Sequence, residues 1–251
     1  MATLAAAEFR AVMIGGSLLA VNAGFINVVT LAGVFTVTVS HVTGNVSRIA
    51  ITLFRFDMTS LILVTSVVFS YGFGAFVAGF MVGDAKFKLG QSYGYALLLE
   101  SAMLLGSFIF LQRELLVGEW CAAFACGLQN ALATNYSGMV VRTTHMTGIV
   151  TDIGNILGQA CRRDTKAETW RLRVHVPLLV SYIVGGLFGQ ATYVLIGENA
   201  LILPFLFTGI IALVYLNLPP IQRAAQQLRE LAQHHAHQQP HLEVRYIGDP
   251  R

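Results

Sequence analysis

Long stretches without a charged residue run through this chain, and they limit its fold more than any other feature. The uncharged stretches are residues 11–47, 58–83, 120–141, 174–197 and 199–222, and residues 89–112 contain Glu100 as their one charged residue. About 20 apolar residues are enough for a helix to cross the hydrocarbon core of a bilayer. The sequence therefore predicts an all-α integral membrane protein with about six transmembrane helices, centred near residues 21, 71, 102, 126, 185 and 209.

The composition indicates lipid rather than water as the solvent. Hydrophobic residues make up 55% of the chain and charged residues only 12%, whereas an ordinary globular protein contains about 25% charged residues. The net charge of +3 is too small to indicate a nucleic-acid partner, and the three cysteines are expected to be reduced, packed thiols. Because the sequence contains no nucleophile–base set, metal-binding motif or phosphate-binding loop, we expect neither an enzyme nor a bound cofactor.

The basic residues indicate how the spans are oriented. The densest basic cluster lies between the fourth and fifth predicted spans and consists of Arg162, Arg163, Lys166, Arg171 and Arg173. Loops rich in Lys and Arg stay on the cytoplasmic side, so this loop and both termini are expected to be cytoplasmic. Arg48, Arg55 and Arg113 are exceptions, and an eight-span arrangement fits the charge rule almost as well. Six spans are preferred because the segment 44–56 is only about 13 residues long and contains Arg48.

The chain contains an internal duplication. The run AGFIN at residues 23–27 is matched by CGLQN at residues 126–130. A His-x-Thr-Gly motif follows 14 or 15 residues after the asparagine of each run, in HVTGN at residues 41–45 and in HMTGI at residues 145–149. The same order of motifs in both halves predicts two copies of one structural unit.

The duplication divides the chain into two predicted membrane repeats, residues 1–115 and 116–218, each with three spans. A unit with three spans must invert when it is repeated, so the repeats are expected to be related by an axis in the membrane plane. A third match, SYGFGAFVA at residues 70–78 and SYIVGGLFG at residues 181–189, places small residues where helices are expected to pack closely. Residues 219–251 are predicted to form a cytoplasmic amphipathic helix and a His-rich tail.

Each His-x-Thr-Gly motif is expected to join extended backbone to a half-helix. In the first half the β-branched run at residues 34–40 precedes the motif, and a short helical pattern follows it. Thr43 and Thr147 can cap the first turn, and Gly44 and Gly148 leave backbone amides accessible. Two positive helix ends that meet at the repeat interface predict an anion site. The alternative is that Thr and Gly only close a turn, with each histidine bonded to a neighbouring carbonyl.

Two opposite charges occupy equivalent positions in the two halves. Arg48 and Asp152 each follow the histidine of their motif by seven residues. Because an unpaired charge inside a membrane is costly, we predict that the two side chains face each other as a gating ion pair. The alternative is that Arg48 extends to the lipid headgroups while Asp152 caps a helix turn.

Glu100 lies near the middle of a predicted span that contains no basic residue. An ionisable residue inside a membrane is a functional candidate, and a buried carboxyl could bind and release a proton. The alternative is a protonated glutamic acid that is hydrogen-bonded between helices.

The paired motifs resemble those of the YoaK family of small bacterial membrane proteins. The resemblance covers about residues 12–218 and rests on G-x-x-N…H-x-T-G-N in the first half and QN…T-T-H-M-T-G…D in the second. The matching positions are His41, Thr43, Gly44, Asn45, Gln129, Asn130, Thr144, His145, Thr147, Gly148 and Asp152. The resemblance implies a multi-span inner-membrane protein with a transport-related role, and it names no substrate.

The expected function is secondary transport of a small, anionic solute through a site at the repeat interface. The residues expected to bind the solute are Asn27, His41, Thr43, Gly44, Asn45, Gln129, Asn130, His145, Thr147 and Gly148. The solute and membrane lipid are the expected partners, a proton is a candidate coupling ion, and a homo-oligomer is compatible with the sequence. The alternative is a non-transporting scaffold or sensor that acts through its cytoplasmic tail.

Overall fold

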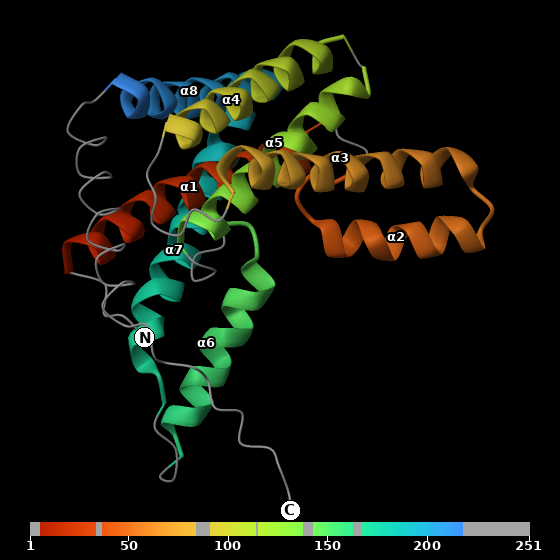
Figure 1. Ribbon diagram of the computed structural model, residues 1–251. Helices are drawn as coiled ribbons and strands as arrows, with labels where there is room; N and C mark the ends of the chain where they lie inside the picture. The colour runs from red at the N-terminus through yellow and green to blue at the C-terminus, as the bar shows by residue number, and fades with distance from the viewer. Residues whose placement is uncertain are drawn as a thin grey trace, which may run out of the picture.

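The computed structural model describes residues 6–33, 37–83, 91–113, 115–137, 143–162 and 167–217. Every regular element in these ranges is helical, which confirms the predicted all-α fold (Figure 1). In chain order the helices are α1 (Ala6–Ala32), α2 (Val42–Phe54), α3 (Met58–Val82), α4 (Gln91–Leu111), α5 (Val117–Ser137), α6 (Met146–Ala160), η1 (Thr169–Arg171), α7 (Leu172–Ile196), η2 (Gly197–Leu201) and α8 (Ile202–Asn217). The boundary predicted at residue 115 falls between α4 and α5, and the tail at residues 219–251 lies outside the described residues.

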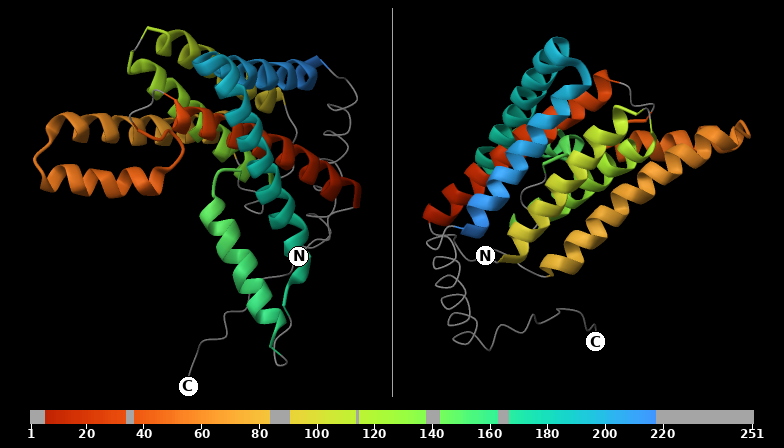
Figure 2. Two further views of the ribbon diagram at one scale, coloured as in Figure 1. Left: turned by 180° about the vertical axis from the view of Figure 1, so that it is seen from behind. Right: turned by 90° about the horizontal axis from the view of Figure 1, so that it is seen from above.

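Several of these helices are long and apolar enough to cross a membrane. By length and composition the candidates are Met13–Ala32, Met58–Val82, Gln91–Leu111 and Thr169–Asn217. The last stretch contains both α7 and α8, which point in different directions on either side of η2 (Figure 2). The span predicted near residue 126 is not among these candidates, because α5 contains Glu119 and many small and polar residues. Instead α5 is largely buried and packs against α3 and α4.

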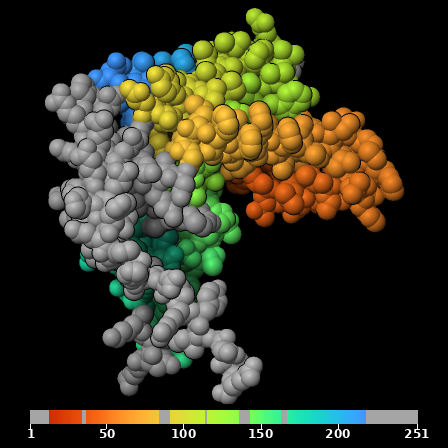
Figure 3. Space-filling view, viewed as in Figure 1, coloured from red at the N-terminus to blue at the C-terminus, as the bar shows by residue number. Residues whose placement is uncertain are grey.

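The two half-helices expected after the His-x-Thr-Gly motifs are present as short helices. They are α2, with 13 residues, and α6, with 15 residues. Each packs on the second long helix of its own half, α2 on α3 and α6 on α7. The views in Figures 1 and 2 show both short helices starting near the centre of the molecule and extending outward from it. In Figure 3 the α2–α3 pair projects as an arm, with an open angle between it and α6.

The long helices exchange partners between the two halves. The most extensive packing joins α1 to α7 and α3 to α5, so the first helix of each half lies against the third helix of the other half. In the α1–α7 pair, a Cβ atom at Gly24 would lie 2.0 Å from the carbonyl oxygen of Tyr182. A Cβ atom at Gly185 would lie 2.0 Å from the carbonyl oxygen of Val21. Only glycine allows this approach of the two backbones.

The α3–α5 pair has the same construction. A Cβ atom at Gly74 would lie 2.1 Å from the carbonyl oxygen of Phe124, and one at Gly127 would lie 1.9 Å from that of Tyr71. The glycine pairs of the two interfaces occupy matching places in the duplicated sequence. The expectation that small residues of the SYGFGAFVA and SYIVGGLFG runs mediate close helix packing is therefore confirmed.

The second long helix of each half, α3 or α7, also ends in the same way. Gly83 follows α3 with φ 62°, and Gly197 follows α7 with φ 61°. Glycine adopts this left-handed conformation without a steric penalty, and it is the common residue just after a helix. A matching chain reversal therefore follows the second long helix in both halves.

Candidate functional site

The two short helices begin at the histidines of the motifs, with almost the same backbone conformation. The N-cap residue of α2 is His41, with φ −87° and ψ 61°, and that of α6 is His145, with φ −89° and ψ 57°. Neither histidine side chain forms a capping hydrogen bond with the first turn. The carbonyl oxygen of His41 already accepts the amide of Asn45 at 3.1 Å, and that of His145 accepts the amide of Ile149 at 3.2 Å. Both motifs therefore start a helix at the histidine.

The prediction that the two threonines cap these helices is wrong. Thr43 and Thr147 lie inside the first turn, because each helix starts two residues earlier than a threonine cap requires. Their carbonyl oxygens accept hydrogen bonds from the next turn, from Ser47 Oγ at 3.1 Å and from Thr151 Oγ1 at 2.9 Å. Both threonine side chains belong to exposed residues, which leaves their hydroxyl groups at the surface of the first turn.

The two glycines of the motifs have different surroundings. A Cβ atom at Gly44 would meet no atom within 4 Å, so the space beside the first turn of α2 is open, as expected. A Cβ atom at Gly148 would lie 2.7 Å from Nδ1 of His145. The ring of His145 therefore covers the corresponding place on α6.

Asn27 connects α1 to the start of α2. Its side chain is 5% exposed, and its Nδ2 lies 2.7 Å from Nε2 of His41. Its Oδ1 accepts a hydrogen bond from Ser40 Oγ, so Nδ2 is the donor to the ring of His41. The hydroxyl of Tyr182 on α7 is also within hydrogen-bonding reach of Asn27. The structure thus brings the predicted residues Asn27 and His41 together.

Asn45 is predicted to bind solute, and its side chain also forms hydrogen bonds with the link that precedes α2. It is 1% exposed, and its Nδ2 donates to the carbonyl oxygen of Thr38 at 2.6 Å. Its Oδ1 accepts from Thr38 Oγ1 at 3.2 Å. Both ends of the amide are used, so Asn45 fixes the irregular link onto α2.

The second half places Gln129 and Asn130 in the interior. Gln129 is fully buried and donates through Nε2 to the carbonyl oxygen of Leu19 on α1 at 3.3 Å, while its Oε1 has no partner. The side chain of Asn130 is within hydrogen-bonding reach of the Tyr71 hydroxyl on α3, and its Oδ1 has no partner. Asn130 and Tyr71 therefore repeat the contact that Asn27 makes across the other interface.

A buried acid and a thiol lie beside these asparagine–tyrosine pairs. Glu100 on α4 is fully buried, and neither of its carboxylate oxygens has a hydrogen-bond partner. Cys126 on α5 is buried and interacts electrostatically with Glu100 and with both tyrosines. We name this group the polar centre, and it consists of Asn27, Tyr71, Glu100, Cys126, Asn130 and Tyr182.

The tyrosines and the cysteine of the polar centre were not among the site residues predicted from the sequence. Tyr71 and Tyr182 are the second residues of the matched SYGFGAFVA and SYIVGGLFG runs. A tyrosine at the same place in both halves was the signal that could have found them. No comparable signal existed for Cys126, because its counterpart in the first half is Ala23.

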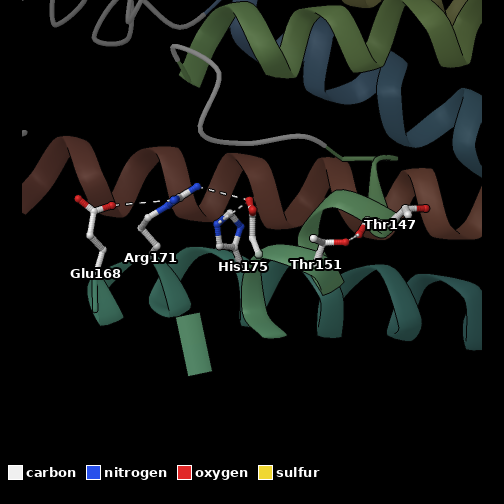
Figure 4. Close-up of polar contacts among 6 residues, drawn as sticks. Thr147, Thr151, Glu168, Arg171 and His175 are labelled. Atoms are coloured by element: carbon white, nitrogen blue, oxygen red, sulfur yellow. Dashed lines mark hydrogen bonds and ion pairs between the residues drawn. The ribbon is translucent and has the colours of Figure 1, made fainter. Parts of the chain in front are cut away.

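Asp152 takes its polar partners from its own half rather than the predicted Arg48. Its Oδ2 lies 3.4 Å from Nη2 of Arg171 and 3.6 Å from Nε2 of His175. Arg171 also approaches Glu168 at 3.9 Å, as Figure 4 shows. Arg48 lies on α2, which extends away from α6 in Figures 1 and 2. The cluster therefore fastens α6 to η1 and α7, and the partial exposure of Arg171 and Asp152 limits their ion pair to about 1 kcal/mol or less.

These observations define the class of the protein as membrane-like and helical, with several helices long and apolar enough to cross a membrane and with polar side chains buried in its interior. The chain belongs to the family described as "Protein of unknown function (DUF1275)", whose sequence profile matches residues 15–214. That range contains both His-x-Thr-Gly motifs and the whole polar centre. Comparison with the curated proteins and with the solved structures gave no match. Within the described ranges, no group of three or more His, Cys, Asp or Glu side chains is placed to hold a metal ion.

Proposed function

We propose that the protein is a secondary transporter that carries a small, anionic solute across the inner membrane. The observation that supports this most strongly is the pair of short helices that begin at His-x-Thr-Gly motifs in the same backbone conformation. Both begin near the centre of the molecule, in Figures 1 and 2. The narrower likeness to the YoaK family stays a prediction and agrees with this proposal.

The starts of these helices favour an anion. The first amides of a helix, residues 42–44 in α2 and 146–148 in α6, have no partner within the helix, and they carry its positive dipole end. No acidic side chain lies in the first turn of either helix, and neither N-cap side chain forms a capping hydrogen bond. A carboxylate, phosphate or sulfate group can fill such a place. The open space beside Gly44 gives it room.

The helix lengths support two inverted repeats as the framework of the transporter. At 1.5 Å per residue, α2 and α6 are about 20 and 22 Å long, which is shorter than the hydrocarbon core of about 30 Å. We take α1, α3 and α4 as the crossings of the first half and α5, α7 and α8 as those of the second, and an odd number of crossings inverts the second half. With this topology the loop at residues 162–173 and both termini are cytoplasmic, in agreement with the basic cluster.

A two-step experiment tests the proposal. The purified protein is first screened for thermal stabilisation by anionic and neutral solutes, since a ligand at 100 times its Kd stabilises the folded state by about 2.7 kcal/mol. Any stabilising solute is then offered to proteoliposomes. We expect an anion to stabilise the protein and to be taken up, and we expect removal of residues 219–251 to leave uptake unchanged. If no anion is bound or taken up, the proposal is wrong. Loss of function on removal of the tail alone favours the scaffold or sensor.

A further inference from the structure

We propose that Glu100 binds and releases the proton that is coupled to solute movement. This inference rests on the proposed transport function and assigns its coupling ion. Glu100 lies in the middle of α4 and has no exposed surface. Both of its carboxylate oxygens lack a hydrogen-bond partner. A merely structural glutamic acid would bond to a neighbouring helix, and the described residues supply no such bond.

The helices that surround Glu100 contain no basic residue. Glu100 lies on α4, which packs against α8, α5 and, less extensively, α3 and η2. None of α3, α4, α5 and α8 contains Lys, Arg or His. The carboxyl group of Glu100 is fully buried, and among the described residues it has no charged partner.

The titratable groups that these elements present are acids, thiols and phenols. The thiol of Cys126 on α5 interacts electrostatically with Glu100. The other titratable residues with described side chains on these elements are Glu119 and Cys121 of α5, Tyr71 of α3, Tyr93 and Tyr95 of α4, Tyr215 of α8 and Glu198 of η2. None of these groups can neutralise a carboxylate.

The proton therefore stays on Glu100 in the closed arrangement that the structure shows. An unpaired carboxylate in a membrane interior is much less stable than the neutral acid. When the site opens to water on one side, the carboxyl gives its proton to water and becomes a hydrated carboxylate. When it opens on the other side, the carboxylate oxygen takes a proton from water. One proton is bound and one is released per cycle, so atoms and charge balance.

Glu100 is placed to couple this proton to the solute. Cys126 interacts electrostatically with Glu100 and also with Tyr71 and Tyr182. The two tyrosines in turn reach the asparagines of the polar centre, and Asn27 bonds to the histidine that begins α2. The acid and the proposed anion site therefore share one set of packed side chains. A proton that moves with an anion also reduces the net charge carried across the membrane.

Infrared spectroscopy of the full-length protein in detergent tests this assignment without a solute. A neutral carboxylic acid gives a carbonyl band above the amide I band. We expect a band at neutral pH that is present in the wild type and in Glu119→Gln but absent in Glu100→Gln. We expect transfer to heavy water to shift this band, because the site opens and exchanges its proton. We also expect Glu100→Gln to stay folded, since glutamine has nearly the same shape and no charge.

Three results would overturn the inference. The first is a spectrum in which Glu100→Gln removes no band, since Glu100 is then ionised. The second is a band that heavy water never shifts, since the acid is then a fixed structural group. The third is loss of the band on addition of sodium chloride at constant pH, since Glu100 then binds a metal cation. Each of these results leaves the solute screen unaffected, so a failure here and a failure of the transport proposal are distinguishable.

Discussion

Asn45 and Ile149 occupy the same place in the two His-x-Thr-Gly motifs, but they hold their helices by different means. Asn45 uses both ends of its amide to bind Thr38 in the link before α2. Ile149 is buried in an apolar cluster with Ala20, Val174 and Leu178. The first link is therefore held by hydrogen bonds and the second motif by apolar packing.

Replacing Asn45 should show this difference. Asn45→Ala removes the donor to the carbonyl oxygen of the half-buried Thr38, and the loss of such a donor costs about 1–3 kcal/mol. We expect a clear fall in the melting temperature of the purified protein. Ser47→Ala is the matched control on the same helix, because Ser47 is exposed and bonds only within α2. Equal melting temperatures for the two variants would contradict this account of Asn45.

Asp57 provides a test at the surface. It is the N-cap of α3, and hydrogen bonds from the side chain and the backbone amide of Ser60 hold its pKa below the ordinary value of 3.8. Because the folded-state pKa is the lower one, this stabilisation is complete above the ordinary pKa and is lost as pH falls through the lowered value. Asp57→Asn keeps a cap that does not titrate. We expect acidification to lower the melting temperature of the wild type more than that of Asp57→Asn. Parallel curves for the two proteins would contradict the prediction.

At the scale of elements, the contacts between α1 and α7 and between α3 and α5 set the arrangement of the two halves. Each contact depends on glycines that face a carbonyl oxygen of the partner helix. A carbonyl oxygen belongs to the backbone and cannot move aside as a side chain can. The close approach therefore has little tolerance for any added atom.

Gly74→Ala should be strongly destabilising for this reason. Its Cβ atom would lie 2.1 Å from the carbonyl oxygen of Phe124, and overpacking of this kind costs about 1–3 kcal/mol or more. Gly72→Ala on the same helix is the control, since its Cβ atom would meet nothing within 4 Å. We expect Gly74→Ala to reduce the yield of folded protein and its melting temperature, and Gly72→Ala to leave both unchanged. A stable Gly74→Ala protein would show that the two helices do not pack this closely.

The sequence predicted those elements that depend on local pattern. The long helices follow from uncharged apolar stretches, and the short helices follow from motifs that occur twice. Partner choice between helices was not predictable, because apolar stripes look alike and the decisive contacts join residues as distant as Gly24 and Tyr182. For the same reason equivalent positions suggested Arg48 as the partner of Asp152, whereas Arg171 lies much nearer to Asp152 along the chain and meets it.

Within the site, residues in repeated motifs were predicted from the sequence, whereas features that depend on backbone conformation or packing were not. The histidines and glycines of the motifs were found because their spacing repeats. The capping role of the threonines was wrong, because a helix start depends on the backbone conformation at His41 and His145. The tyrosines of the polar centre come from the opposite half in each case, so only the packed structure reveals their contact with the asparagines.

At the scale of the whole molecule, the two halves interlock around the polar centre and leave an open angle between the α2–α3 arm and α6 (Figure 3). Both short helices start near the centre of the molecule (Figures 1 and 2), where the positive ends of their dipoles lie, and His41 at the start of α2 bonds to Asn27 of the polar centre. An anion bound there would contact both halves at once. The binding of solute could then control the movement of one half against the other.

The central claim is that an anion binds at the start of the short helices, and Gly44→Ala tests it most directly. Its added methyl group meets no protein atom within 4 Å, so it should leave the fold intact and obstruct only a bound ligand. Gly154→Ala is the control, because Gly154 has equally open surroundings and lies further along α6.

The measurement is thermal stabilisation of the wild type and these two variants by inorganic phosphate, sulfate and small carboxylates. The account predicts that at least one anion stabilises the wild type and Gly154→Ala by the same amount, and that it stabilises Gly44→Ala at least tenfold more weakly in apparent affinity. Equal stabilisation of all three proteins, or of none, would contradict it.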